Sequence, residues 1–101
     1  MMQGDYYGLK IEILSADGEA VTSDDVSDVE ITVGFVRKTH ADFDIIYNDG
    51  FWIMPLTQEE TFKMPATRVK AQVRVKWKDG SVEGASLGEI LVHESISKEV
   101  L

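Results

Sequence analysis

The sequence predicts an all-β fold, a two-layer β-sandwich of six to seven short antiparallel strands with one or two short helical turns. Several stretches alternate apolar with polar residues, and three Asp-Gly pairs, at 17–18, 49–50 and 79–80, follow or separate them. A period of two is the side-chain pattern of a strand, and Asp-Gly supplies the positive φ that tight hairpins need. Strand and helix patterns do not alternate, which argues against an α/β fold, and a barrel-like variant is the alternative to the sandwich.

The first four predicted strands lie in the N-terminal half of the chain. Apolar residues alternate at 9–13, just before the first Asp-Gly pair, and again at 29–35. Alternating stretches at 43–47 and 52–56 flank Asn48-Asp49-Gly50, which has the composition of a tight turn. We therefore expect these two stretches to form a hairpin.

The C-terminal half holds the longest predicted strand, at 69–78. Its apolar residues face one way and its polar residues the other without interruption, a pattern that a helix does not produce. Asp79-Gly80 then turns the chain into a strand at 82–85, and a last strand holds Ile90 and Val92.

Two short segments match helical turns rather than strands. Residues 22–25 suit a single turn capped by Asp24 or Asp25. Thr57-Gln58-Glu59-Glu60 matches a capping box, in which the Thr accepts from a backbone N–H and the last Glu reaches back. Pro65 limits that helix to a turn or two.

Length and composition indicate a single domain over residues 1–101. Apolar residues make up 44% of the chain, enough for a core, and the absence of Cys excludes disulfides, thiolate metal sites and a Cys nucleophile. Residues 1–5 lack a signal-peptide pattern. Residues 1–8 are expected to form a mobile arm, with a mobile tail at 95–101. No apolar run could span a membrane, so we expect synthesis in the cytoplasm and no membrane partner.

The net charge of −8 disfavours a nucleic-acid partner, because phosphate is repelled. Five of the ten basic residues nevertheless fall close together and form what we term the basic stripe: Arg68, Lys70, Arg74, Lys76 and Lys78. Two interpretations stay open. In the first, the stripe is a solvated face whose cations pair with residues such as Glu83 or Glu12, or protect a sheet edge from unwanted strand pairing. In the second, the stripe docks onto an acidic face of a partner or of another copy.

Nothing in the sequence predicts an enzyme or a cofactor site. Catalysis needs titratable groups beside a nucleophile, and neither His40, in a polar loop at 38–41, nor His93 has such a neighbour in a known motif. Both histidines are expected at the surface. Residues 84–88 are rich in Gly but lack the Lys-Ser/Thr of a phosphate-binding loop, so we expect them to join two strands.

Clustered carboxylates raise the question of calcium. Asp24, Asp25 and Asp28 lie close together in the chain, and Asp42 and Asp44 would share one strand face. Neither group has the spacing of an EF-hand loop. We interpret the first group as a helix cap and the second as solvated edge charges, with no metal.

The aromatic residues divide into core and contact candidates. Trp52 and Trp77 are expected in the core, because aromatic cross-strand pairs stabilise hairpins. Phe51 points opposite to Trp52 and is expected to be an exposed contact residue. Tyr6 and Tyr7 lie in the N-terminal arm, where aromatic residues without a core suit a partner subunit.

The order of these features is similar to that of a known class of proteins. A strand ending in Asp-Gly, an acidic stretch and an apolar strand precede a hairpin that ends in Trp52-Ile53-Met54-Pro55-Leu56-Thr57. A Thr-x-x-Glu segment, Met64-Pro65-Ala66 and the long strand into Lys78-Asp79-Gly80 follow. Over residues 9–93 this layout resembles small structural proteins of the tail and baseplate region of phages and prophages of Gram-positive bacteria, in particular the N-terminal domain of baseplate upper proteins.

The resemblance implies an immunoglobulin-like β-sandwich that acts in multiple copies as a non-enzymatic structural or adaptor component of a virion. It implies no catalytic residue. Its partners would be other virion proteins or copies of the chain itself, with a homo-oligomer as one outcome. The alternative function is a carbohydrate-binding or surface-adhesion sandwich that uses Tyr47 and Phe51 at the end of a hairpin.

Overall fold

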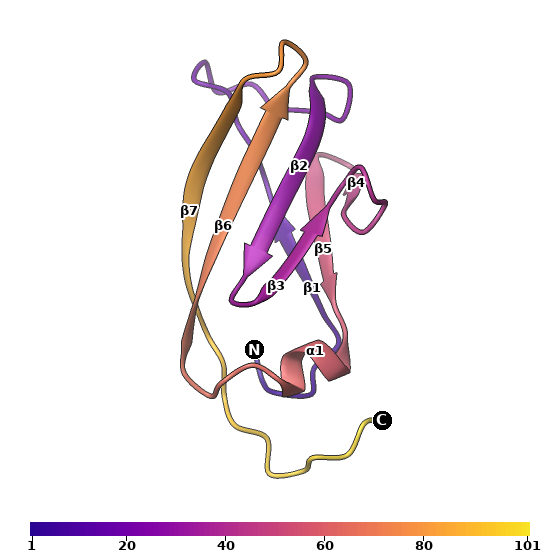
Figure 1. Cartoon of the computed structure of the whole chain (residues 1–101), viewed down its shortest axis with the longest axis vertical. Coiled ribbons are helices and arrows are strands. Elements are labelled where there is room, and N and C mark those ends of the chain that lie inside the picture. The colour runs from indigo at the N-terminus through magenta and orange to yellow at the C-terminus, as the bar shows by residue number, and fades with distance from the viewer.

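The computed structural model describes all 101 residues and folds them into two layers of strands with one short helix (Figure 1). The elements are β1 (Tyr7–Ile11), β2 (Val26–Val33), β3 (Val36–Thr39), β4 (Ile46–Asn48), β5 (Phe51–Leu56), α1 (Gln58–Phe62), β6 (Arg68–Trp77) and β7 (Val82–Leu91). One sheet has the order β1-β5-β4 and the other β3-β2-β6-β7, and every strand pair is antiparallel. The predicted all-β sandwich of six to seven antiparallel strands is confirmed, with seven strands.

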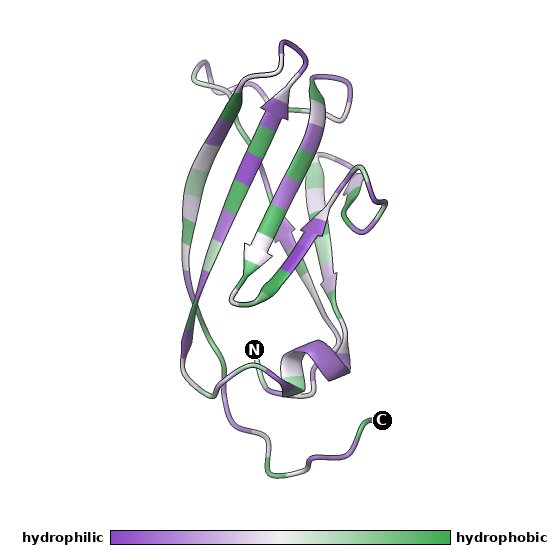
Figure 2. Cartoon of the chain, in the orientation of Figure 1, coloured by the Kyte–Doolittle hydropathy of each residue, from purple (hydrophilic) through white to green (hydrophobic).

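A single hydrophobic cluster fills the space between the sheets. It contains 16 buried residues, among them Trp52 and Met54 of β5 and Val29 and Ile31 of β2. Figure 2 shows the alternation that builds it, with apolar and polar residues following one another along β2 and β6. Trp52 is fully buried, as predicted, and its indole Nε1 donates to the backbone oxygen of Val21 at 3.2 Å.

The strand order differs from that of an immunoglobulin constant-type domain at β2. In that domain the second strand lies in the sheet of the first, fourth and fifth strands. Here β2 lies between β3 and β6, in the other sheet. The two-layer architecture is the same, but the connection from β2 to β3 stays within one sheet.

A tight hairpin that the sequence interpretation missed makes that connection. Val33 pairs with Val36, which leaves a two-residue loop of Gly34 and Phe35. Gly34 has a φ of 58°, as the first loop position of a type II′ turn requires. The prediction that the strand continues to Phe35 is wrong, because Phe35 lies in the turn and is 58% exposed.

The predicted hairpin around Asp49-Gly50 is present, but its first strand is shorter than expected. β4 has only three residues. Phe43, predicted to begin that strand, lies outside it and is 89% exposed with a φ of 63°. Asp42 and Asp44 lie in and just after the turn that precedes β4, so the prediction that they share a strand face is wrong.

The two strands predicted at 82–85 and 90–92 form one strand, β7. It pairs with β6 along its whole length, and the register shifts once, where Leu87 is the extra residue of a β-bulge. The bulge breaks the period of two in β7. For that reason the sequence shows two short patterns where the structure has one strand of ten residues.

The helical turns follow the predicted sequence signals with one correction. α1 begins at a complete capping box, in which Thr57 and Glu60 exchange side-chain and backbone hydrogen bonds. In the turn at 22–25 the capping residue is Thr22, whose hydroxyl accepts from the N–H of Asp24 at 3.3 Å. Asp25 instead reaches back to the N–H of Thr22 at 2.9 Å, so neither Asp is the cap.

Both terminal segments lie at the α1 end of the sandwich (Figure 1). Within residues 1–8, expected as a mobile arm, the N–H of Gln3 donates to the oxygen of His93 at 2.9 Å. The N–H of Gly4 donates to the hydroxyl of Thr61 at 2.9 Å. The tail at 95–101 forms no strand, and the side chain of Ile96 is fully exposed.

Candidate interaction surfaces

The outer face of the four-stranded sheet carries the basic stripe, apart from Lys78 in the turn after β6. β6 lies between β2 and β7, so its cations do not guard an edge, as the sequence interpretation had allowed. Five cations and three anions share this face, which is therefore positive on a chain of net charge −8. The cations are Arg37, Arg68, Lys70, Arg74 and Lys76, and the anions are Asp28, Glu30 and Glu89.

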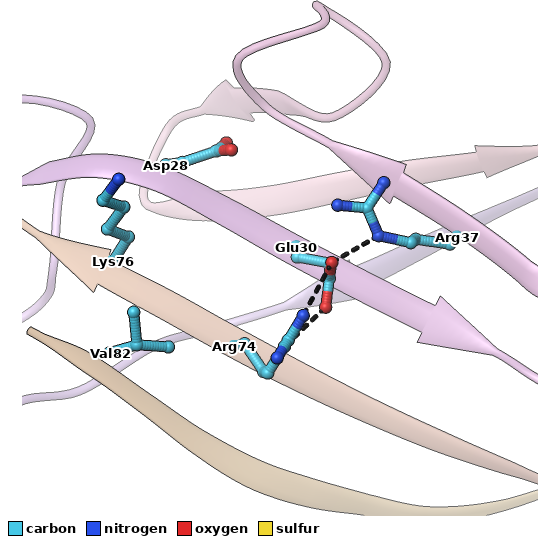
Figure 3. A pocket seen from close by; sticks show the side chains of 6 residues that line it. All are labelled: Asp28, Glu30, Arg37, Arg74, Lys76 and Val82. Atoms are coloured by element: carbon cyan, nitrogen blue, oxygen red, sulfur yellow. Dashed lines mark hydrogen bonds and ion pairs between the residues drawn. The ribbon is translucent and has the colours of Figure 1, made fainter.

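Glu30 of β2 lies at the centre of a charged network on this face (Figure 3). Arg74 lies directly opposite it on β6 and donates to its carboxylate through Nε at 2.7 Å and Nη2 at 3.1 Å. Arg37 of β3 donates to the same carboxylate through Nε. The Glu30 side chain is 10% exposed, whereas those of Arg37 and Arg74 are 60% and 54% exposed.

This arrangement holds Glu30 ionised. The hydrogen bond from Arg74 lowers the pKa of Glu30, and the bond and charge of Arg37 add to this, against burial, which raises it. Reciprocally, the hydrogen bond and charge of Glu30 raise the pKa of Arg74. The carboxylate therefore ties β3 and β6 together across β2 in charged form.

A shallow hollow next to Glu30 is lined by Asp28, Lys76 and Val82 as well as by the two arginines (Figure 3). Asp28 accepts the backbone N–H of Ala41 at 2.9 Å and so fixes the turn after β3. Lys76 has no salt-bridge partner, and Arg37 uses only its Nε on Glu30. Free N–H donors therefore remain at the hollow for an incoming carboxylate.

The predicted ion-pair partners of the basic stripe were wrong. Only Arg74 is paired, and its partner is Glu30 rather than Glu83 or Glu12. Glu83 lies opposite Val75, on the inward side of β7, and Glu12 lies beyond the end of β1. The sequence interpretation also missed Glu30 and Arg37, because it did not detect the hairpin that brings β3 beside β2.

β7 forms one edge of this sheet and differs from the other three edge strands. It has ten residues, nine of them exposed and one half-buried, and no strand lies on its outer side. Figure 1 shows it running along the side of the sandwich. The other edge strands have five residues (β1), four (β3) and three (β4). β7 is therefore the long open edge of the domain.

The outer face of the three-stranded sheet is more apolar. Phe51 and Ile53 of β5 face outward there with Ile46 of β4. The ammonium of Lys10 lies 5.4 Å from the centre of the Phe51 ring. Phe51 is 38% exposed and points away from Trp52, as the sequence interpretation expected.

Tyr47 belongs to the opposite side of that sheet. It lies opposite Trp52 in the register and its ring packs against the indole at a centroid distance of 4.8 Å. Tyr7 also faces inward, opposite Leu56, and packs against the core, so it is not an arm residue. Tyr6 is exposed.

The two histidines have different surroundings. His93 is exposed. His40 was expected at the surface, but it is half-buried, with Nδ1 2.8 Å from the oxygen of Ile45 and its ring edge-on to Trp52 at 5.1 Å. No group of three or more His, Cys, Asp or Glu side chains could hold a metal ion.

Comparison with protein-family models, with curated proteins and with solved structures gave no match.

The single helix has five residues, and no helix of the chain is long and apolar enough to cross a membrane.

Proposed function

We propose that this chain is a non-enzymatic structural or adaptor domain that works through protein–protein contacts, in the tail or baseplate of a phage or prophage. The open edge of β7 carries the contact part of the proposal. An extended segment can add to such an edge, because the unpaired backbone groups supply hydrogen bonds and the exposed side chains supply specificity. The phage context rests on the resemblance of residues 9–93 to baseplate-region proteins.

The charge beside β7 favours an acidic partner. Lys76 lies opposite Val82, and Arg74 lies opposite Gly84, so two cations flank the strand on its outer face. A partner segment paired with β7 would place its outward side chains within one strand of these cations. Complementary charge of this kind sets orientation and association rate more than affinity.

The carbohydrate-binding alternative has less support. A sugar-stacking site needs aromatic rings that present one surface to the ligand. Tyr47 and Phe51 lie on opposite faces of the β4–β5 hairpin, and the ring of Tyr47 is occupied by Trp52. A glycan array tests what remains of the alternative, and binding that is lost in Phe51→Ala would favour it over the adaptor proposal.

The proposal is tested with purified proteins. The products of the genes on either side of this one are expressed and mixed singly with the chain, and complex formation is measured by isothermal titration calorimetry at low and at physiological salt. We expect at least one tail or baseplate product to bind, more weakly as salt rises. Neighbouring genes without tail functions, together with products that do not bind, contradict the proposal.

A further inference from the structure

We propose that, when no other partner segment occupies this edge, β7 pairs with β7 of a second copy, antiparallel, about a two-fold axis between residues 86 and 87. This inference rests on the proposed function, because it names a partner for the same open edge. The joined sheet would run from β3 of one copy to β3 of the other. An edge that pairs with itself in this way closes after two copies and does not continue into a fibre.

The other end of the four-stranded sheet is unsuited to such pairing. β3 has four residues, and its Lys38 points inward, where its ammonium bonds Pro55 and Glu60. A short strand with an inward charge is a common device against edge-to-edge association. β7 also has a charge on its inward side, Glu83, and a bulge at Leu87, but it has ten residues and no Lys, no Arg and no Pro. Of the two edges, only β7 offers a long row of backbone groups.

The side-chain faces of β7 determine the register. Outward residues must lie opposite outward residues in the partner, because a two-fold axis normal to the sheet keeps its faces. Before the bulge Val82, Gly84 and Ser86 face outward, and after it Glu89 and Leu91 do. When the part before the bulge pairs with the part after it, even-numbered residues must therefore face odd-numbered ones. Among the registers that satisfy this condition, an axis between residues 86 and 87 pairs the whole strand.

The register pairs apolar side chains at the two ends of the joined strands. It places Val82 opposite the partner's Leu91, and both side chains are exposed apolar groups in one copy. It places Gly84 opposite the partner's Glu89, so that the carboxylate approaches the row that holds Arg74. Glu83 faces the partner's Ile90. No two like charges lie directly opposite each other, and such oppositions are what destabilises cross-strand pairs.

Disulfide crosslinking tests the register directly, since the chain contains no cysteine. Val82→Cys and Leu91→Cys chains are prepared separately and oxidised mildly, alone and as an equal mixture. In the proposed register Val82 faces the partner's Leu91, whereas like residues of the two copies lie about 30 Å apart along the strands. We expect a disulfide-linked dimer from the mixture and little from either chain alone. Equal crosslinking in all three samples, or none in the mixture, overturns the register.

Sedimentation equilibrium of the cysteine-free chain tests the pairing itself. Gly84→Asp would oppose the partner's Glu89, whereas within one copy it lies beside Arg74, and Gly84→Asn is the uncharged match of the same size. We expect wild type and Gly84→Asn to dimerise, with a dissociation constant roughly fivefold higher for Gly84→Asp. A strictly monomeric wild type, or equal constants for the two variants, overturns the inference.

These measurements use the chain alone, so their failure is distinguishable from failure of the proposed function. A monomer that still binds a neighbouring gene product would remove the self-pairing and leave the adaptor role standing. A dimer that binds none of those products would leave the self-pairing and remove the adaptor role.

Discussion

The ammonium of Lys38 donates to the carboxylate of Glu60 at 2.9 Å and so ties the edge strand β3 to helix α1. The same ammonium donates to the backbone oxygen of Pro55 in β5 at 2.6 Å. Lys38 thus joins the two sheets and the helix at one point. Its inward charge also disfavours strand pairing at the β3 edge, whereas β7 leaves a long edge open on the other side of the sheet.

Replacing Lys38 by Met is expected to destabilise the domain. The substitution keeps the apolar stem but leaves the oxygen of Pro55 and the carboxylate of Glu60 without their donor in a largely covered site. We expect a loss of about 1 to 3 kcal/mol in the free energy of unfolding, measured by urea denaturation. The matched control is Lys63→Met, because Lys63 lies at the end of α1 and forms no salt bridge. It should change the free energy of unfolding little. Equal stability of the two variants would contradict the role of Lys38.

The stability of the domain is expected to fall in acid. The hydrogen bond from Arg74 lowers the pKa of Glu30 below its ordinary 4.5. For Glu60, burial raises the pKa, but the bonds from Thr57 and Lys38 outweigh it and the net shift is also downward. A carboxyl whose folded pKa is depressed contributes stability that is complete above its unfolded pKa and is lost as pH falls through the folded pKa. Unfolding free energies should therefore be flat near neutrality and decline below about pH 4.5.

Glu30→Gln isolates one part of that pH dependence. The amide cannot titrate, so the variant should be less stable than wild type at pH 7 by about 1 to 2 kcal/mol and the difference should shrink in acid. Denaturant titrations at several pH values between 2.5 and 7 give both curves. A stability difference that stays constant over this range would show that Glu30 is not held ionised by its arginines.

The cations of the basic stripe are expected to differ in how much each contributes to the stability of the domain. Lys70 and Lys76 have no salt bridge, so their change to Gln should alter stability by no more than about 0.5 kcal/mol. Arg74→Gln should be the most destabilising of the three, because Glu30 loses its main partner. Thermal unfolding compares the three variants. If Lys76→Gln were as damaging as Arg74→Gln, the lysine would have a structural partner that the fold does not predict.

The β2–β3 turn offers a test of the fold itself. An added Cβ at Gly34 would lie 2.8 Å from Cγ1 of Val69. The backbone φ of 58° at Gly34 is also strained for any residue with an L side chain. Gly34→Ala should therefore cost about 1 to 3 kcal/mol. Phe35→Ser, at the exposed neighbouring position, should have a much smaller effect on the unfolding midpoint. The opposite order of effects would mean that the chain does not turn at Gly34.

The sequence predicted the elements whose patterns are regular. The strands at 52–56 and 69–77 alternate strictly, and Asp49-Gly50 and the Thr57 capping box are local signals, so all of these were found. The β2–β3 hairpin was not predicted, because its turn contains no Asp-Gly pair and the apolar alternation runs on through Phe35. Gly34-Phe35, a Gly-X pair between two β patterns, is the signal that would have revealed it.

The network at Glu30 could not be predicted without the strand order. Its members come from positions 30, 37 and 74, and nothing local to any of them indicates the other two. The position of β7 at an open edge could not be predicted for the same reason. Whether β7 is an edge depends on which strands flank it, and its bulge at Leu87 had also divided its pattern in two.

Hydrogen–deuterium exchange of residues 82–91 tests most directly whether the domain works through protein contacts at the β7 edge. Exchange is measured by mass spectrometry on the chain alone at low concentration and in complex with the neighbouring gene product that binds it most tightly. We expect the β7 amides without a partner on β6 to become protected in the complex, while β4 and α1 change little. Unchanged exchange in β7, with protection confined to other elements, would contradict it.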